Sequence, residues 1–150
     1  MRRGLAIVRG QATVWLLPSL EAALAEAEAS AGETDAGIRR LDDSLAELER
    51  TEQRWFEAEI HRMRGEILLK RDPADTAAAD QSLQAAIAIA QSQKARSFEL
   101  RTATSLARLR RDQGHCTEAR DLLAPVYGWF TEGFDTADLK EAAALLSELT

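Results

Sequence analysis

The densest group of side chains able to form charged hydrogen bonds is a set of arginines in one predicted helix, which runs from Ser97 to about Gln113. Arg101, Arg108 and Arg111 are seven and three residues apart, so they share one face of that helix. Guanidinium groups bind carboxylates through charge-assisted, two-pronged hydrogen bonds. The pattern indicates a surface for an acidic peptide or for a C-terminal carboxylate.

Residues suited to catalysis or to metal binding do not form a recognisable site. His61 is predicted to lie within a helix, one turn after Glu57, but HExxH is absent and a metal would need further ligands. His115 and Cys116 are adjacent, so their side chains diverge and do not suit a Cys–His nucleophile. The nucleophile-elbow and phosphate-loop motifs are absent too. We expect no enzyme activity, no cofactor and no metal.

The composition favours helices. Of the 150 residues, 45% are hydrophobic, and Ala, Leu, Glu, Arg and Gln predominate. These residues are strong helix formers, whereas the β-branched and aromatic residues that favour strands are scarce. The sequence therefore predicts an all-α protein.

Charge and cysteine content limit the partners and the compartment. The formal net charge is −6, whereas proteins that bind nucleic acids normally have a basic excess. The longest apolar run near the N-terminus, Val14 to Leu17, is too short to cross a bilayer. A single cysteine forms no internal disulfide and fits a reducing compartment. We expect a cytoplasmic protein that binds neither nucleic acid nor membranes.

Small residues recur at intervals of about forty positions. One set has spacings of 40 and 42 residues: Ala25, Gly65 and Ala107. A second set has spacings of 42 and 40 residues: Gly37, Ala79 and Ala119. Small residues at matching positions let the two helices of a hairpin pack closely, while larger apolar residues fill the space beside the crossing. The third unit follows tetratricopeptide spacing at its small and apolar positions, although the period exceeds 34 residues.

This spacing predicts one domain over residues 1–150, built as a right-handed superhelical array of tetratricopeptide-like antiparallel hairpins. We expect three units, at about residues 11–50, 52–93 and 96–130, and a C-terminal capping helix over residues 136–149. Residues 2–9 are predicted to be the end of an earlier helix, which suggests the C-terminal part of a larger architecture. Pro18 is predicted to begin or to kink the helix that follows.

Turn and capping residues predict the remaining helix ends. Gly32 and Gly114 are predicted to end helices, because glycine readily adopts the left-handed conformation found there. Helix starts are predicted at Thr34 or Asp35, Thr51, Asp72–Pro73, Thr117 and Thr136. Pro125 is predicted to bend or to divide its helix.

In tetratricopeptide arrays the first helix of each hairpin lines the concave face. By this analogy we predict a peptide-binding face composed of Glu59, Arg62, Glu66, Arg101, Thr104, Arg108 and Arg111. Two interpretations stay open at this point. The arginines can be free to bind an acidic partner, or Glu59 and Glu66 can pair with them across the groove.

Three stretches resemble a known group of proteins: residues 54–66, residues 107–114 and residues 118–136, with Asp138 to Ala142 after the third. They resemble the C-terminal tetratricopeptide-like tails of bacterial multidomain proteins that combine an adenylate or guanylate cyclase domain with an AAA-type or STAND-type ATPase module. In such proteins the chemistry belongs to other domains. The resemblance implies a sensor or scaffold arm that serves in signalling.

Two functions are therefore expected. The first is an interaction module that binds a protein or peptide, acidic in character, through its concave face. The alternative is a structural or regulatory module that forms a homodimer, or that packs on the other domains of its own chain.

Overall fold

The computed structural model describes the backbone of residues 2–150 and the side chains of residues 15–150. This part of the chain contains no β-strand. Its helices are α1 (Arg2–Ser30), α2 (Thr34–Thr51), α3 (Glu57–Arg71), α4 (Thr76–Ser92), α5 (Arg96–Asp112), α6 (Cys116–Tyr127) and α7 (Ala137–Glu148), with a 3-10 turn, η1 (Arg54–Phe56), before α3. The predicted all-α class is confirmed.

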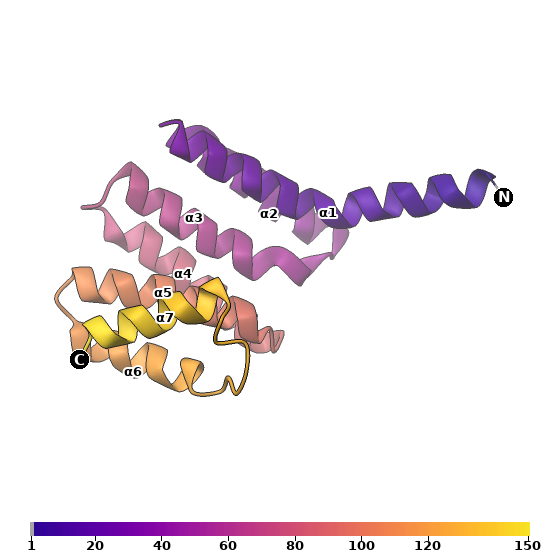
Figure 1. Cartoon of the computed structure of the whole chain (residues 1–150). Coiled ribbons are helices and arrows are strands. Elements are labelled where there is room, and N and C mark those ends of the chain that lie inside the picture. Colours follow the sequence, from indigo (N-terminus) through magenta and orange to yellow (C-terminus); the bar gives the residue numbers. More distant parts are fainter. Residues whose placement is uncertain (1) are drawn as a thin grey trace.

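Consecutive helices form three hairpins, α1–α2, α3–α4 and α5–α6, and α7 packs on the last one (Figure 1). Contacts also link α1 to α3, α3 to α5 and α5 to α7. Four helices from different parts of the chain thus form one continuous side of the molecule. The right-handed tetratricopeptide superhelix stays a prediction.

The small residues lie where the two helices of a hairpin approach each other. A Cβ atom on Gly37 would lie 2.7 Å from the carbonyl oxygen of Ala25, and one on Gly65 would lie 2.8 Å from Cγ of Leu83. Ala107 and Ala119 are fully buried in one cluster between α5, α6 and α7. The apolar core between the helices is completed by larger fully buried side chains: Leu41, Ile60, Leu83, Leu100, Leu106 and Leu123.

Three tight turns have the same hydrogen-bond pattern. After α1, α4 and α5 the chain adopts a positive φ, at Gly32, Lys94 and Gly114 respectively. In each turn the next residue donates its N–H to the carbonyl five positions earlier, as from Ala95 to Ala90. This is the Schellman arrangement, which satisfies carbonyl groups at a helix end. Gly32 and Gly114 end helices as predicted, but nothing in the sequence singled out Lys94.

Some predicted helix ends are wrong. Residues 2–9 belong to the same continuous helix as residues 11–30, and Pro18 lies inside it. Thr51 ends α2 instead of capping the next helix, because its hydroxyl donates to the carbonyl oxygen of Glu47 at 2.8 Å and Glu52 adopts a positive φ. The Thr136 N-cap of α7 is confirmed.

Two proline signals were also misplaced. Asp72 does not cap α4: its carboxylate accepts a hydrogen bond from the N–H of Ala74 at 3.0 Å in the preceding turn, and α4 begins at Thr76. Pro125 does not divide α6, which ends two residues later at Tyr127. A proline this close to the C-terminal end leaves only a short stretch of helix after it.

Candidate peptide-binding groove

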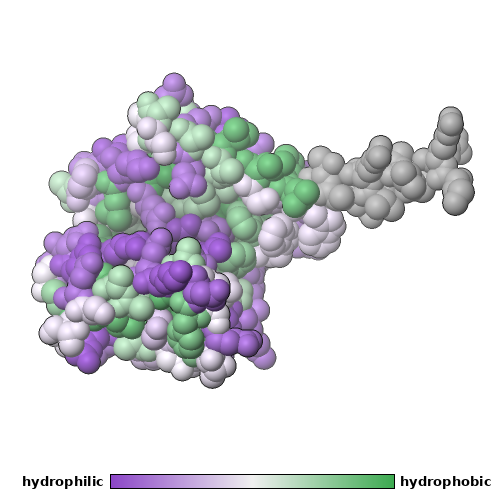
Figure 2. Space-filling view, viewed as in Figure 1, coloured by the Kyte–Doolittle hydropathy of each residue, from purple (hydrophilic) through white to green (hydrophobic). Residues whose placement is uncertain are grey.

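A polar hollow of about 330 Å³ lies on the side formed by α1, α3, α5 and α7. In Figure 2, hydrophilic side chains gather at the centre of this side, between α3 and α7. We call this hollow the groove. It is lined by Glu26, Glu59, Arg62, Glu66, Arg101, Thr104, Ser105, Arg108, Asp138 and Glu141.

Glu59 is the buried centre of the charges in the groove. Its residue is only 4% exposed, although it is an acid. Arg62, one turn later on α3, donates two hydrogen bonds to its carboxylate, at 3.0 and 2.6 Å. Arg101 on α5 donates a third, at 3.4 Å. A buried carboxylate requires such partners, because burial without them would cost several kcal/mol.

The network continues outward along the helices. Arg62 also donates to Glu66 at 2.6 Å, and the same carboxylate oxygen accepts a hydrogen bond from the Ser105 hydroxyl at 2.6 Å. Arg101 donates to Asp138 of α7 at 2.7 Å. Helices α3, α5 and α7 are therefore connected by charge-assisted bonds along the floor of the groove.

The charges shift the pKa values of the two central arginines. Burial alone would lower the pKa of Arg62, but the hydrogen bonds and charges of Glu59 and Glu66 raise it above its ordinary value. For Arg101, burial likewise opposes the effect of Asp138 and Glu59, which together raise the pKa. Both side chains stay positively charged at any pH at which the protein is folded.

Six of the seven residues predicted to form the binding face line the groove. The hydroxyl of Thr104 donates to the carbonyl oxygen of Leu100 at 2.8 Å, so this side chain is already bonded to its own helix. Arg111 is not part of the groove. It pairs with Asp112 and with Glu148, beyond the end of the groove.

Sequence reasoning missed four residues of the groove: Glu26, Ser105, Asp138 and Glu141. Ser105 had a signal, since it lies four residues after Arg101 on the same helix. Asp138 and Glu141 enter only because α7 docks against α5, and no local pattern indicated that contact.

The structure has the internal pairing that the sequence left open. Arg62 binds Glu59 and Glu66, Arg101 binds Glu59 and Asp138, and Arg108 binds Glu141 at 3.1 Å. The lining contains five carboxylates and three guanidinium groups, so its formal charge is −2. Glu26 makes no ion pair with any side chain from residue 15 onward. The groove thus presents excess negative charge, although arginines suggested the opposite.

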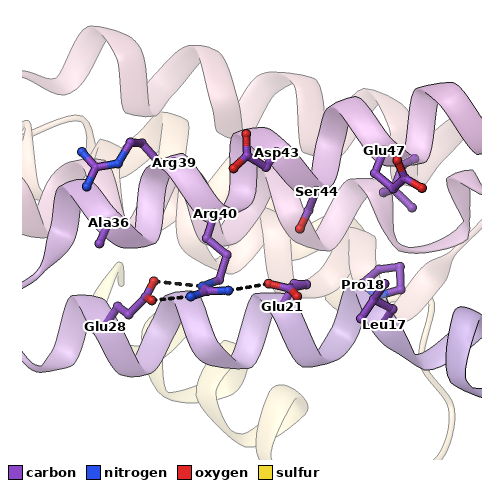
Figure 3. A pocket seen from close by; sticks show the side chains of 11 residues that line it. Leu17, Pro18, Glu21, Glu28, Ala36, Arg39, Arg40, Asp43, Ser44 and Glu47 are labelled. Carbon is purple, nitrogen blue, oxygen red and sulfur yellow. Dashed lines mark hydrogen bonds and ion pairs between the residues drawn. The ribbon is translucent and has the colours of Figure 1, made fainter.

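A second hollow of about 460 Å³ lies between α1 and α2. Arg40 reaches from α2 to α1, where it pairs with Glu28 at 2.6 Å and with Glu21 at 2.7 Å (Figure 3). The hydrogen bond from Arg40 lowers the pKa of Glu28. Leu17, Pro18 and Leu48 provide apolar lining. These ion pairs join the two helices of the first hairpin.

The remaining reactive groups lie apart. Burial lowers the pKa of the half-buried His61 below its ordinary value, mainly because the charged imidazolium would lose hydration. Cys116 is exposed at the start of α6. From residue 15 onward, His, Cys, Asp and Glu side chains form no group of three that could hold a metal ion. No described helix has both the length and the apolar character needed to cross a lipid bilayer.

Comparisons with protein families, with curated proteins and with solved structures found no match for this chain.

Proposed function

We propose that this chain is a non-enzymatic protein-interaction module of tetratricopeptide type, and that the groove binds a peptide segment of a partner protein. The observation that supports this most is a polar hollow built from four helices, α1, α3, α5 and α7, in a stack of helical hairpins. Repeat arrays use such composite surfaces for binding, because neighbouring units add up to one extended face.

The ion pairs give the groove a fixed arrangement before any ligand arrives. Arg62 is held by two carboxylates, and Arg101 is held by two others from α3 and α7. A ligand that meets preorganised side chains loses less free energy to ordering them. The groove therefore suits recognition, in which geometry must be kept.

The charge balance favours a basic segment over the acidic one expected from the sequence. An incoming carboxylate would have to displace Glu59, Glu66 or Asp138 from arginines that they already neutralise. An incoming Lys or Arg meets exposed carboxylates instead, because Glu26 is exposed and the side chains of Glu66 and Glu141 are 41% and 58% exposed. Such complementarity raises both the association rate and the selectivity.

The resemblance of residues 54–66 and 118–136 to cyclase and ATPase tails supports a place in signalling. In this proposal the module is the regulatory tail of a larger bacterial protein. Its partner is then either another protein or a basic segment of the parent chain, and the module works in the cytoplasm.

A selection from a random displayed-peptide library tests the groove. We expect the full chain to enrich peptides rich in Lys and Arg, with an affinity that falls as salt is added. The double variant Glu66→Gln/Glu141→Gln should weaken binding of a selected peptide by about tenfold, which corresponds to about 1.4 kcal/mol.

The matched control is Glu49→Gln/Glu132→Gln, which removes the same two charges from exposed positions outside the groove. It should leave the affinity unchanged. Enrichment of acidic peptides, or equal weakening by the two double variants, would show that the groove is not the binding site proposed.

A further inference from the structure

The exposed apolar side chains of this protein are concentrated on one helix. Eight large hydrophobic residues are exposed among the side chains from residue 15 onward, and five of them lie within residues 15–24 of α1. They are Trp15, Leu16, Leu17, Leu20 and Leu24, with exposures between 44% and 56%. Isolated exposed hydrophobic residues are normal, but a contiguous group of this kind marks an interaction site.

The group forms a stripe on the side of α1 that faces away from its own hairpin. Leu16, Leu20 and Leu24 are four residues apart, so they follow one line along the helix. The residues that face the core are different ones, including the buried Ala22 and Ala25. In Figure 2, this part of α1 is visible as a hydrophobic area at the edge of the molecule. We call Leu16, Leu20 and Leu24 the leucine stripe.

α1 is also longer than its partner. It has 29 residues, whereas α2 has 18, and its N-terminal part continues past the hairpin (Figure 1). The helix therefore has a length along which α2 gives it no cover. An occupant of the leucine stripe must match a helix of this length.

The charges along the sequence of α1 indicate the occupant. Between residues 2 and 14 the charged residues are Arg2, Arg3 and Arg9, with no acid. Between residues 15 and 30 they are Glu21, Glu26 and Glu28, with no base. The two halves of the helix thus have formal charges of +3 and −3. A second α1 in the opposite direction would place unlike charges together at both ends, whereas a parallel one would place like charges together.

We propose that this chain forms a homodimer in which α1 packs antiparallel against α1 of a second copy, about a two-fold axis through the leucine stripe. The interface is isologous, since the same stripe serves both copies. Leucine burial drives the association, and the opposed charges fix the direction. This dimer is independent of the groove, which lies on α3, α5 and α7 and on a different side of α1.

Sedimentation equilibrium of the full chain over a range of concentrations tests the dimer. We expect a mass twice the 16.5 kDa of the chain. The variant Leu16→Glu/Leu20→Glu should raise the dissociation constant by at least about a hundredfold, because the two-fold axis buries four new charges. Circular dichroism should show that the helix content is kept. The control Phe134→Glu, at an exposed residue of similar type, should leave the dimer intact.

Charge reversal tests the direction. Glu26→Arg and Arg9→Glu should each weaken the dimer, and the two substitutions combined in one chain should restore it, since the altered charges are again opposed. A single-chain mass at every concentration would overturn the proposal. So would a dimer insensitive to the leucine substitutions, or a combined variant weaker than either single one, which would indicate parallel helices.

Discussion

Gly37 and Ala25 lie so close together that the backbone of α1 occupies the place where a side chain on Gly37 would begin: a Cβ there would lie 2.7 Å from the carbonyl oxygen of Ala25. Gly37→Ala should lower the free energy of unfolding by about 1–3 kcal/mol, because the hairpin must open to admit a methyl group. This loss occurs although alanine is the better helix former by about 1 kcal/mol. Urea denaturation measures it, and a stabilised variant would contradict it.

Gly65→Ala tests the same principle where the obstacle is a side chain. The new Cβ would lie 2.8 Å from Cγ of Leu83 and 3.2 Å from the carbonyl oxygen of Ala79. We expect Gly65→Ala to destabilise the native chain, and to cost less in a Leu83→Ala background, where Cγ is gone. The coupling follows from a double-mutant cycle of unfolding free energies. Additive effects would show that Leu83 is not the obstacle.

Glu59 should be the most sensitive charge of the groove to neutralisation. Glu59→Gln keeps the shape but weakens bonds to Arg62 and Arg101 in a buried place, so we expect a loss of about 1–3 kcal/mol in the free energy of unfolding. The control Glu118→Gln removes a carboxylate that is 66% exposed and 3.9 Å from Arg110, and it should change stability by less than about 0.5 kcal/mol. Similar losses in both variants would contradict the role of burial.

His61 should make the protein less stable in mild acid. Burial lowers its pKa in the folded state below the ordinary value of 6.5, so the unfolded chain binds a proton more readily. Its contribution to stability is complete above pH 6.5 and falls as the pH drops below that value. His61→Gln should therefore show a smaller difference between unfolding free energies measured at about pH 7.5 and pH 5.5. An unchanged difference would exclude His61 as the cause.

Arg40 should make stability depend on pH in a lower range. Because Arg40 lowers the pKa of Glu28 from 4.5, the pair stabilises the fold above that pH and loses its effect as the pH falls further. In Arg40→Met the melting temperature should fall less steeply below pH 4.5 than in the native chain. The control Arg120→Met, at an exposed position, should keep the native slope. If both variants lose the slope, net charge is the cause.

Much of the fold could be predicted because its signals are local. Helix-forming composition predicted the all-α class, and Gly32 and Gly114 predicted two helix ends, since each signal depends on a few neighbouring residues. The spacing of Ala25, Gly65 and Gly37 located the close contacts within hairpins, because only small residues permit them. The turn at Lys94 was missed, since a lysine rarely adopts a positive φ.

The site was harder to predict, because its chemistry depends on which charges meet. Helical spacing correctly grouped Arg101 with Arg108, but Asp138 and Glu141 reach the groove only through the docking of α7. Without them the arginines look like an excess of positive charge. The sign of the groove is a tertiary property, so the sequence suggested an acidic ligand where the structure favours a basic one.

The attachment of α7 has a thermodynamic consequence. Its ion pairs to α5 use Arg101, Arg108 and Arg111, and the first two of these also line the groove. One guanidinium group cannot bond fully to α7 and to an incoming anion at the same time. A competing anion and a docked C-terminal helix therefore oppose each other by the same free energy in both directions, as linkage requires. A cation in the groove leaves those bonds intact.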